Sequence, residues 1–255
     1  MSKTKNYLNE TKIHLLRDLA SRYNTKSFIS EDPVKFPNSY TQKQDIEISA
    51  LISSWIAYGN RKQILQTLTK LHSDFDNSPY NYIKNRSFDK YANDNACLYR
   101  FYTNQDYYQL CNTLHNIYCV EGFMSLEDKL LAMSKQYKDA THLLENLISL
   151  FPNQKGIPQN TKSACKRLCL LLRWLIRQDH IVDLGIWNLL PQSELLIPLD
   201  THVFRLAKQI GLTDRNTADM KTVKEITQAM KEVFPTDVAL GDFALFGYGV
   251  SGNDF

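Results

Sequence analysis

Features that would mark a membrane, secreted or metal-binding protein are scarce in this sequence. No hydrophobic run is long enough and free enough of charge to span a bilayer, and the N-terminus lacks a signal-peptide pattern. The five cysteines are an odd number, and no two have the C-x-x-C spacing of a zinc ribbon. We therefore expect a reduced, cytoplasmic protein of bacterial type, with no metal site and no membrane association.

A strong charge imbalance is also missing. The formal net charge is +3 and the pI is near 8.5, values that are compatible with a polyanionic partner without demanding one. Hydrophobic residues make up 43% and charged residues 22%, which is ordinary for a globular protein with a core. The 14 Tyr, 12 Phe and 3 Trp could stack on bases, but they equally suit a core. Composition therefore leaves the function open.

Hydrophobic residues recur at helical spacing along almost the whole chain, and no convincing alternation of strand type is present. The residues from 28 to 40 include two prolines and are expected to form a loop, and Gly211 stands where a helix should end. The predicted fold class is all-α. Helices are expected near residues 13–20, 46–56, 64–71, 110–118, 126–137, 143–150, 163–177, 201–210, 223–234 and 238–246.

Asp200 stands directly before a helical pattern in the stretch "IPLDTHV". Its carboxylate can accept the free N–H groups of the first helical turn, so the simplest interpretation is an N-cap. Such a carboxylate is held rigidly and kept ionised, which also suits the stabilisation of a sugar cation. The structural and the catalytic interpretation are compatible. His202 could orient Asp200, or it could be an ordinary surface or core histidine.

A second candidate lies on the helix "SACKRLCLLLRWLIR". Lys166, Leu170, Arg173 and Arg177 are spaced by four, three and four residues and therefore share one face of this helix. A solvated stripe explains such a pattern, and so does a lysine at the inner end of a basic groove. A desolvated lysine amine is a nucleophile that can attack a sugar C1′ and form a Schiff base.

Together, these motifs resemble the helix-hairpin-helix DNA glycosylase superfamily. "IPLDTHVFRLAKQIGL" resembles the aspartate motif of endonuclease III, and the lysine helix resembles the archaeal 8-oxoguanine DNA glycosylases (AGOG). "GDFALFGYG" resembles the late helix of that branch, which implies that Asp242 and Phe246 serve the base pocket. "SACKRL", "IPLDTHV" and "DFALFGYG" together also resemble a bacterial family of unknown function over most of the chain. The resemblance to characterised glycosylases covers roughly the last hundred residues.

The resemblance implies one domain over residues 1–255, made of two helical subdomains with a cleft between them. A variant hairpin is expected at about 151–162, and catalytic helices at about 163–177 and 201–210. "FPNQKGIPQNTK" replaces the usual L-P-G-V-G hairpin, which leaves its phosphate contact in question. No cysteine follows Cys169, so neither an iron–sulfur cluster nor another cofactor is expected.

The resemblance implies that Lys166 and Asp200 are the catalytic residues. Lys162 also fits the lysine motif and stays the alternative nucleophile, although its separation from Asp200 fits the archaeal branch less well. Trp55 matches a base-contacting position but could be a core residue. Arg173 and Arg177 are expected to contact phosphate. Asn60, Arg61 and Gln63 could contact phosphate or the orphan base, although a solvated helix start also explains them. Arg100, Phe101 and Tyr102 could supply a stacking side chain.

The function expected from these residues is base-excision repair. A glycosylase with AP lyase activity would act as a monomer on double-stranded DNA that contains a damaged base or an abasic site, associated with the nucleoid. The lesion implied by the resemblance is an oxidised purine, 8-oxoguanine above all. Two alternatives stay open: a DNA-binding protein that keeps the fold without the chemistry, and a helical scaffold in which Asp200 is only a cap.

Overall fold

A computed structural model describes residues 8–252, and nearly all regular structure in this range is helical. The exception is an antiparallel hairpin formed by β1 (Cys97–Tyr99) and β2 (Tyr102–Thr103). The all-α prediction is confirmed. Among the described residues, no helix has the length and apolar character needed to cross a membrane.

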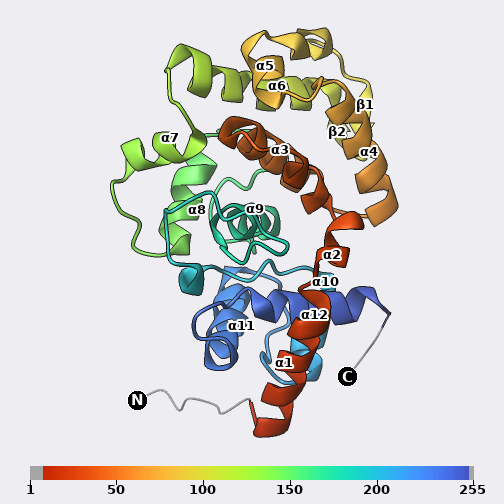
Figure 1. The fold of residues 1–255 in the computed structure, drawn as a ribbon, viewed down its shortest axis with the longest axis vertical. Helices are drawn as coiled ribbons and strands as arrows, with labels where there is room; N and C mark the ends of the chain where they lie inside the picture. The colour runs from red at the N-terminus through yellow and green to blue at the C-terminus, as the bar shows by residue number, and fades with distance from the viewer. Residues whose placement is uncertain (1–7, 253–255) are drawn as a thin grey trace.

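One group of helices unites the two ends of the described chain (Figure 1). It contains α1 (Glu10–Tyr23), α10 (Thr201–Gln209), α11 (Met220–Val233) and α12 (Leu240–Val250), with α1 lying along α12. Close approach of these two helices requires a glycine, because a Cβ at Gly247 would lie 2.2 Å from the Tyr23 ring.

A second group of elements lies at the opposite end of the molecule (Figure 1). The group comprises α3 (Lys43–Ile56), α4 (Arg61–Ser73), α5 (Pro79–Lys84), α6 (Asn104–His115) with a π-helical turn (Asn116–Val120), α7 (Leu126–Met133), α8 (Ala140–Ser149) and the β hairpin. Within it, α4 and α5 pack against α3, α6 packs against α5 and the β hairpin, and α7 packs against α8. Short elements complete the chain: α2 (Lys26–Ser30) and 3₁₀ turns at Pro33–Lys35, Pro37–Ser39, Ser87–Tyr91 and Gln192–Glu194.

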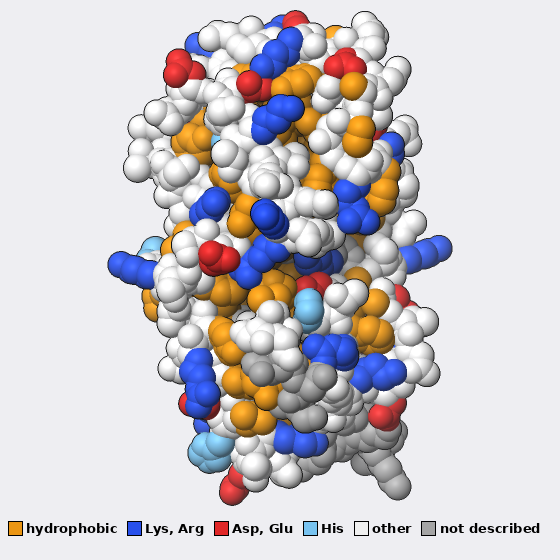
Figure 2. All heavy atoms as spheres, turned by 90° about the vertical axis from the view of Figure 1, so that its right-hand side faces the viewer, with side chains coloured by type: hydrophobic (Ala, Val, Ile, Leu, Met, Phe, Trp, Pro, Cys, Tyr) orange, Lys and Arg blue, Asp and Glu red, His pale blue; other side chains and the backbone are white. Residues whose placement is uncertain are grey.

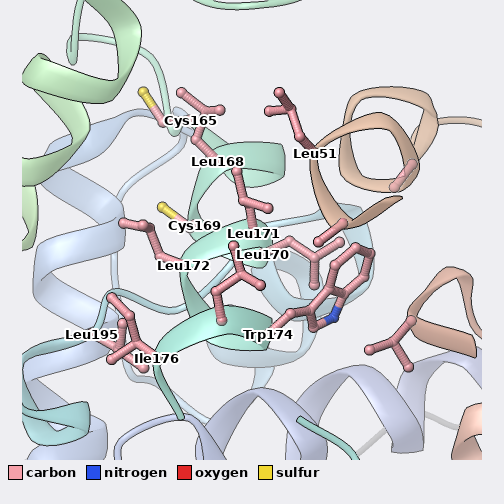
Figure 3. Packing of buried hydrophobic residues seen from close by; sticks show 14 of the residues in the cluster. Leu51, Cys165, Leu168, Cys169, Leu170, Leu171, Leu172, Trp174, Ile176 and Leu195 are labelled. Carbon is pink, nitrogen blue, oxygen red and sulfur yellow. The ribbon is translucent and has the colours of Figure 1, made fainter. Parts of the chain in front are cut away.

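Helix α9 (Lys166–Ile176) runs between the two groups and packs against α3 (Figure 1). Every residue from Leu168 to Ile176 is buried, which explains why apolar side chains occupy nearly all positions. Figure 3 shows its leucines and Trp174 pointing in several directions into the core, one of them toward Leu51 of α3. Helix α9 therefore contacts both groups, through α3 on one side and through the Arg173–Asp242 pair with α12 on the other.

The structure differs from the predicted elements in several places. Helix α5 was not predicted, and α7 ends at Met133 rather than near residue 137. Part of the expected loop at 28–40 forms α2 and two 3₁₀ turns, and the β hairpin was not predicted. Helix α9 begins at Lys166, three residues later than expected. Its preceding residue, Cys165, has φ +48°, which is incompatible with the helix continuing backwards.

The expected variant hairpin at 151–162 is an irregular loop anchored to the second group. Trp55 Nε1 donates a hydrogen bond to the Lys155 carbonyl at 2.7 Å. Gly156 has φ +88°, and a Cβ there would lie 1.9 Å from the Tyr102 hydroxyl. A glycine is required at this position for both reasons.

Candidate functional site

A cavity of about 580 Å³ lies where the two groups of helices meet. Its walls come mainly from residues 28–33, 57–64, 166–173, 198–204 and 242–250, five segments far apart in the sequence. On the face that carries α2 and α4, Lys and Arg side chains gather around hydrophobic ones at mid-height (Figure 2). The cavity combines aromatic side chains with ionisable ones, the composition typical of a binding site for a small polar group.

Lys166 is the first residue of α9 and lines this cavity. Its Nζ donates a hydrogen bond to the Ala57 carbonyl at 3.0 Å. Burial lowers the pKa of the Lys166 amine, and this effect exceeds the opposing influence of the carboxylates of Asp200, Asp242 and Asp32. A larger fraction of the amine is therefore neutral than in a free lysine, as a nucleophilic lysine requires.

Asp200 lines the same cavity and caps α10. Its Oδ1 accepts a hydrogen bond from the Val203 N–H at 2.8 Å, so the predicted N-cap is confirmed. This bond leaves Oδ2 of Asp200 as a second acceptor. Because the backbone of α10 holds the carboxylate in place, its charge acts on Lys166 from a fixed position.

Asp242, from α12, also lines the cavity and forms a buried ion pair with Arg173 of α9. Burial raises the pKa of Asp242 to about 7, against the influence of Arg173 and with added repulsion from Asp200. Arg173 Nε also donates to Asp183 at 3.2 Å. Asp242 therefore changes its charge near neutral pH, within electrostatic range of Lys166.

Arg177 lies one helical turn beyond Arg173 and is likewise buried. Its Nε donates to both carboxylate oxygens of Asp237 at 2.9 Å, and its Nη1 donates to Asp183 at 2.9 Å. The predicted phosphate contacts of Arg173 and Arg177 are contradicted by this burial, since the two side chains are only 2% and 1% exposed. Helical spacing showed the shared face correctly, but carboxylates of other segments cover that face.

The structure separates the two candidate nucleophiles. Lys162 is exposed and does not contribute to the cavity wall, and its carbonyl accepts a hydrogen bond from the Met220 N–H at 3.2 Å. Lys166 shares the cavity with Asp200 and Asp242. The geometry therefore favours Lys166 of the two.

The two aromatic candidates also have different positions. Trp55 is buried away from the cavity wall, and its ring is stacked on Tyr102 with centroids 4.2 Å apart. Its predicted role in a base pocket is contradicted, and the core interpretation holds. Phe246 is partly buried and does line the cavity, with edge-to-face neighbours Phe28 and His202 at 6.2 and 6.4 Å.

Three candidates for DNA contact lie at the start of α4. Asn60 and Arg61 line the cavity, and the Asn60 side chain caps the helix by accepting from the Gln63 N–H at 3.2 Å. Arg61 Nη2 lies 3.8 Å from Asp32 Oδ2. Gln63 is exposed and contributes nothing to the cavity wall.

Several wall residues were missed by sequence reasoning, chiefly Asp32, Phe28 and Tyr58. Asp32 is 6% exposed, and its Oδ1 accepts from the Val34 N–H at 3.0 Å. Burial raises its pKa. In the sequence, Asp32 is marked only by the Asp-Pro pair, which indicates a turn. It was missed because tertiary packing, and not a local motif, brings this segment to the cavity. His202, which the sequence left ambiguous, also lines the cavity.

Within residues 8–252, no cluster of three or more His, Cys, Asp or Glu side chains is arranged to hold a metal ion. The chemical groups that the cavity offers include a lysine amine, three carboxylates, two guanidinium groups, the His202 imidazole and aromatic rings. These can supply a nucleophile, proton transfer and hydrogen bonds to a planar polar ligand.

Comparison with known proteins places the chain in one family. The model of DUF2400, described as a protein of unknown function, matches residues 32–251, so the chain belongs to this family. No curated protein and no solved structure matched the chain. The matched region includes every cavity segment except the part before residue 32.

Proposed function

We propose that the protein is a DNA base-excision glycosylase with AP lyase activity, and that Lys166 is its nucleophile. The observation that supports this most strongly is the meeting of Lys166 and Asp200 in one cavity. The amine there has a lowered pKa, and the carboxylate is fixed by a helix N-terminus. The volume of about 580 Å³ suits an extruded base with part of its sugar.

In the proposed reaction, the lone pair of the Lys166 amine forms a bond to the sugar C1′. The C1′–N bond to the base breaks, and the base leaves with the electron pair and takes up a proton. Asp200 stabilises the positive charge that develops at C1′. The amine nitrogen then loses a proton, its lone pair forms the C1′=N bond of the Schiff base, and the C1′–O4′ bond breaks with its electron pair and a proton going to O4′. A base then removes a 2′ proton, the electrons of that bond form C2′=C3′, and the 3′ phosphate leaves with the C3′–O electron pair, which nicks the strand.

The substrate proposed is double-stranded DNA with an oxidised purine, 8-oxoguanine in the first place, or with an abasic site. Asp242 is proposed to hydrogen-bond to the purine edge and Phe246 to stack on the base. Because Arg173 and Arg177 are buried, phosphate contacts are assigned to the exposed Lys and Arg side chains that gather at mid-height on the face shown in Figure 2. The protein is proposed to act as a monomer in the cytoplasm, at the nucleoid, without a cofactor.

Covalent trapping tests this function directly. A duplex with 8-oxoguanine or an abasic site is incubated with the protein and borohydride, which reduces the Schiff base to a stable adduct. We expect an adduct with the native chain and none with Lys166→Gln. The matched control is Lys162→Gln, in which an exposed lysine four residues away is lost. An adduct that survives Lys166→Gln and disappears with Lys162→Gln would overturn the assignment.

A DNA-binding protein without lyase chemistry is the second candidate. It is favoured by the loop at 151–162, which stands in place of the usual hairpin. In this loop the Lys155 carbonyl accepts a hydrogen bond from Trp55, and Gly156 packs against Tyr102. Tight, salt-sensitive binding to damaged duplex without any trapped adduct would decide for this function.

A further inference from the structure

Asp32 differs from an ordinary buried carboxylate because its hydrogen bonding is incomplete. An ionised carboxylate has about four acceptor sites, and buried acceptors are normally satisfied. Asp32 Oδ1 accepts from the Val34 N–H at 3.0 Å. Within the described chain, Oδ2 has no hydrogen bond, and its nearest cation is Arg61 Nη2 at 3.8 Å.

The molecule itself supplies the contrast. Glu47 is just as buried, but its two oxygens accept four hydrogen bonds, from Tyr118, Trp187 and the N–H groups of Leu126 and Glu127. No such set surrounds Asp32, which instead lines the cavity. An acceptor that is buried, open on one side and placed on a cavity wall is suited to a ligand N–H.

Arg61 supplies the complementary donor beside it. The Arg61 side chain is 31% exposed, lines the same cavity, and lies with its guanidinium 5.9 Å from the Phe28 ring centroid. A carboxylate oxygen and a guanidinium 3.8 Å apart therefore present one acceptor and one donor side by side. The complementary ligand edge carries an N–H next to a C=O, with an aromatic ring available to pack on the ligand plane.

We propose that Asp32 and Arg61 select the substrate base by binding its lactam edge, with Asp32 accepting from the ring N–H and Arg61 donating to the adjacent carbonyl. This rests on the proposed function and narrows its substrate to lactam bases, such as 8-oxoguanine, hypoxanthine and uracil. Bases without that edge, such as 1,N6-ethenoadenine and 3-methyladenine, leave the buried carboxylate unpaired and are rejected. Lys166 of α9 and Asp242 of α12 line the same cavity and keep the roles proposed above.

The experiment measures two rates for each variant: release of the base from duplexes that differ only in the target base, and borohydride trapping on a preformed abasic site. Asp32→Asn preserves the acceptor for the Val34 N–H but replaces the other oxygen with a donor group. We expect the ratio of base release to trapping to fall about 100-fold in Asp32→Asn, because a site built to bind a polar edge discriminates strongly. Arg61→Gln should lower the same ratio. Lys62→Gln, an exposed neighbour outside the cavity wall, should keep it within about twofold.

The outcomes separate the two proposals. Trapping by the native chain together with an unchanged ratio in Asp32→Asn would overturn the selection by Asp32 and leave the glycosylase standing. Release of ethenoadenine or 3-methyladenine as fast as any lactam base would do the same. Failure of the native chain to form an adduct on any duplex would overturn the proposed function itself, and the selection with it. Because trapping needs a folded cavity but no base, it also shows whether each variant is folded.

Discussion

Two sets of buried carboxylates in this molecule have different surroundings. Glu47, in the middle of α3, accepts from the Tyr118 hydroxyl at 2.8 Å, the Trp187 indole at 2.6 Å and the Leu126 N–H at 2.9 Å. Glu127 N–H adds a fourth bond at 3.3 Å. These bonds connect α3 to the π-helical turn, to the loop that contains Trp187 and to the start of α7. Glu47 is therefore a structural hub with no acceptor left for a ligand.

The cavity carboxylates are arranged in the opposite way. Asp200, Asp242 and Asp32 each accept a hydrogen bond from one protein group, and all three face an open volume that also contains Lys166. Burial raises the pKa of Glu47 as well as those of Asp32 and Asp242, so a raised pKa alone does not separate structure from function. The cavity carboxylates differ from Glu47 because their hydrogen bonding is incomplete and they face the cavity.

The largest effect is expected for Asp200→Asn. Asparagine is as good an N-cap as aspartate, so α10 and the free energy of unfolding should hardly change. Loss of the negative charge should lower the single-turnover rate of base release about 10³-fold, the scale for removing one group that stabilises transition-state charge. Rates on an 8-oxoguanine duplex, with thermal unfolding as the control, test this. A nearly unchanged rate would show that Asp200 is only the N-cap of α10 and has no catalytic role.

Next in size is the loss of Arg173, which joins the cavity to the protein interior. Arg173→Met leaves Asp242 without its guanidinium partner and weakens the neutralisation of Asp183. Breaking a buried ion pair on one side costs about 3–5 kcal/mol of unfolding free energy. Urea unfolding measures this, and the double variant with Asp242→Asn should recover part of the loss. A cost below about 1 kcal/mol would show that the pair contributes little.

A smaller effect on stability, and none on catalysis, is expected for Glu47→Gln. The amide has the same size but presents N–H groups to donors such as the Trp187 indole, so at least one bond is lost. We expect a loss of about 2 kcal/mol in urea unfolding at pH 7. The rate of base release per folded molecule should match the native chain. A changed rate would contradict the separation of the two carboxylate sets.

The smallest effect concerns pH. The neutral fraction of Lys166 grows with pH, so strand nicking at an abasic site should rise by at most about tenfold per pH unit. It should level off below the ordinary lysine pKa of 10.5, because burial lowers the pKa of Lys166. Asp242→Asn removes a carboxylate that raises this pKa, so the plateau should begin at lower pH. A rise that continues to pH 10.5 in both proteins would contradict a desolvated lysine.

The sequence predicted those features that depend on local pattern. The apolar spacing gave most helices, the Asp200 cap was confirmed, and Gly211 follows the end of α10 with φ +75° as a C-terminal glycine should. The hairpin β1–β2 was missed because strands of three and two residues are too short to show alternation.

What could not be predicted depends on tertiary contacts. Spacing placed Arg173 and Arg177 on one face, but the aspartates that cover that face come from residues 179–183 and 237–242. Trp55 was ambiguous for the same reason, since its partners Tyr102 and Lys155 are remote in sequence. Asp32 carried no motif and is recognisable only from the cavity that it lines.

The packing of α1 along α12 also governs how the protein can be made. Residues 10–23 leave the ribosome early, but the helix at residues 240–250 that they pack against is synthesised more than 200 residues later. The region around α3 can fold on the emerging chain, because the contacts of α3 are made with elements within residues 33–187. Lys166 is then already synthesised, while Asp242 and Phe246 are still missing from its surroundings. A nascent chain therefore has no completed cavity, because the wall that α12 contributes is synthesised last.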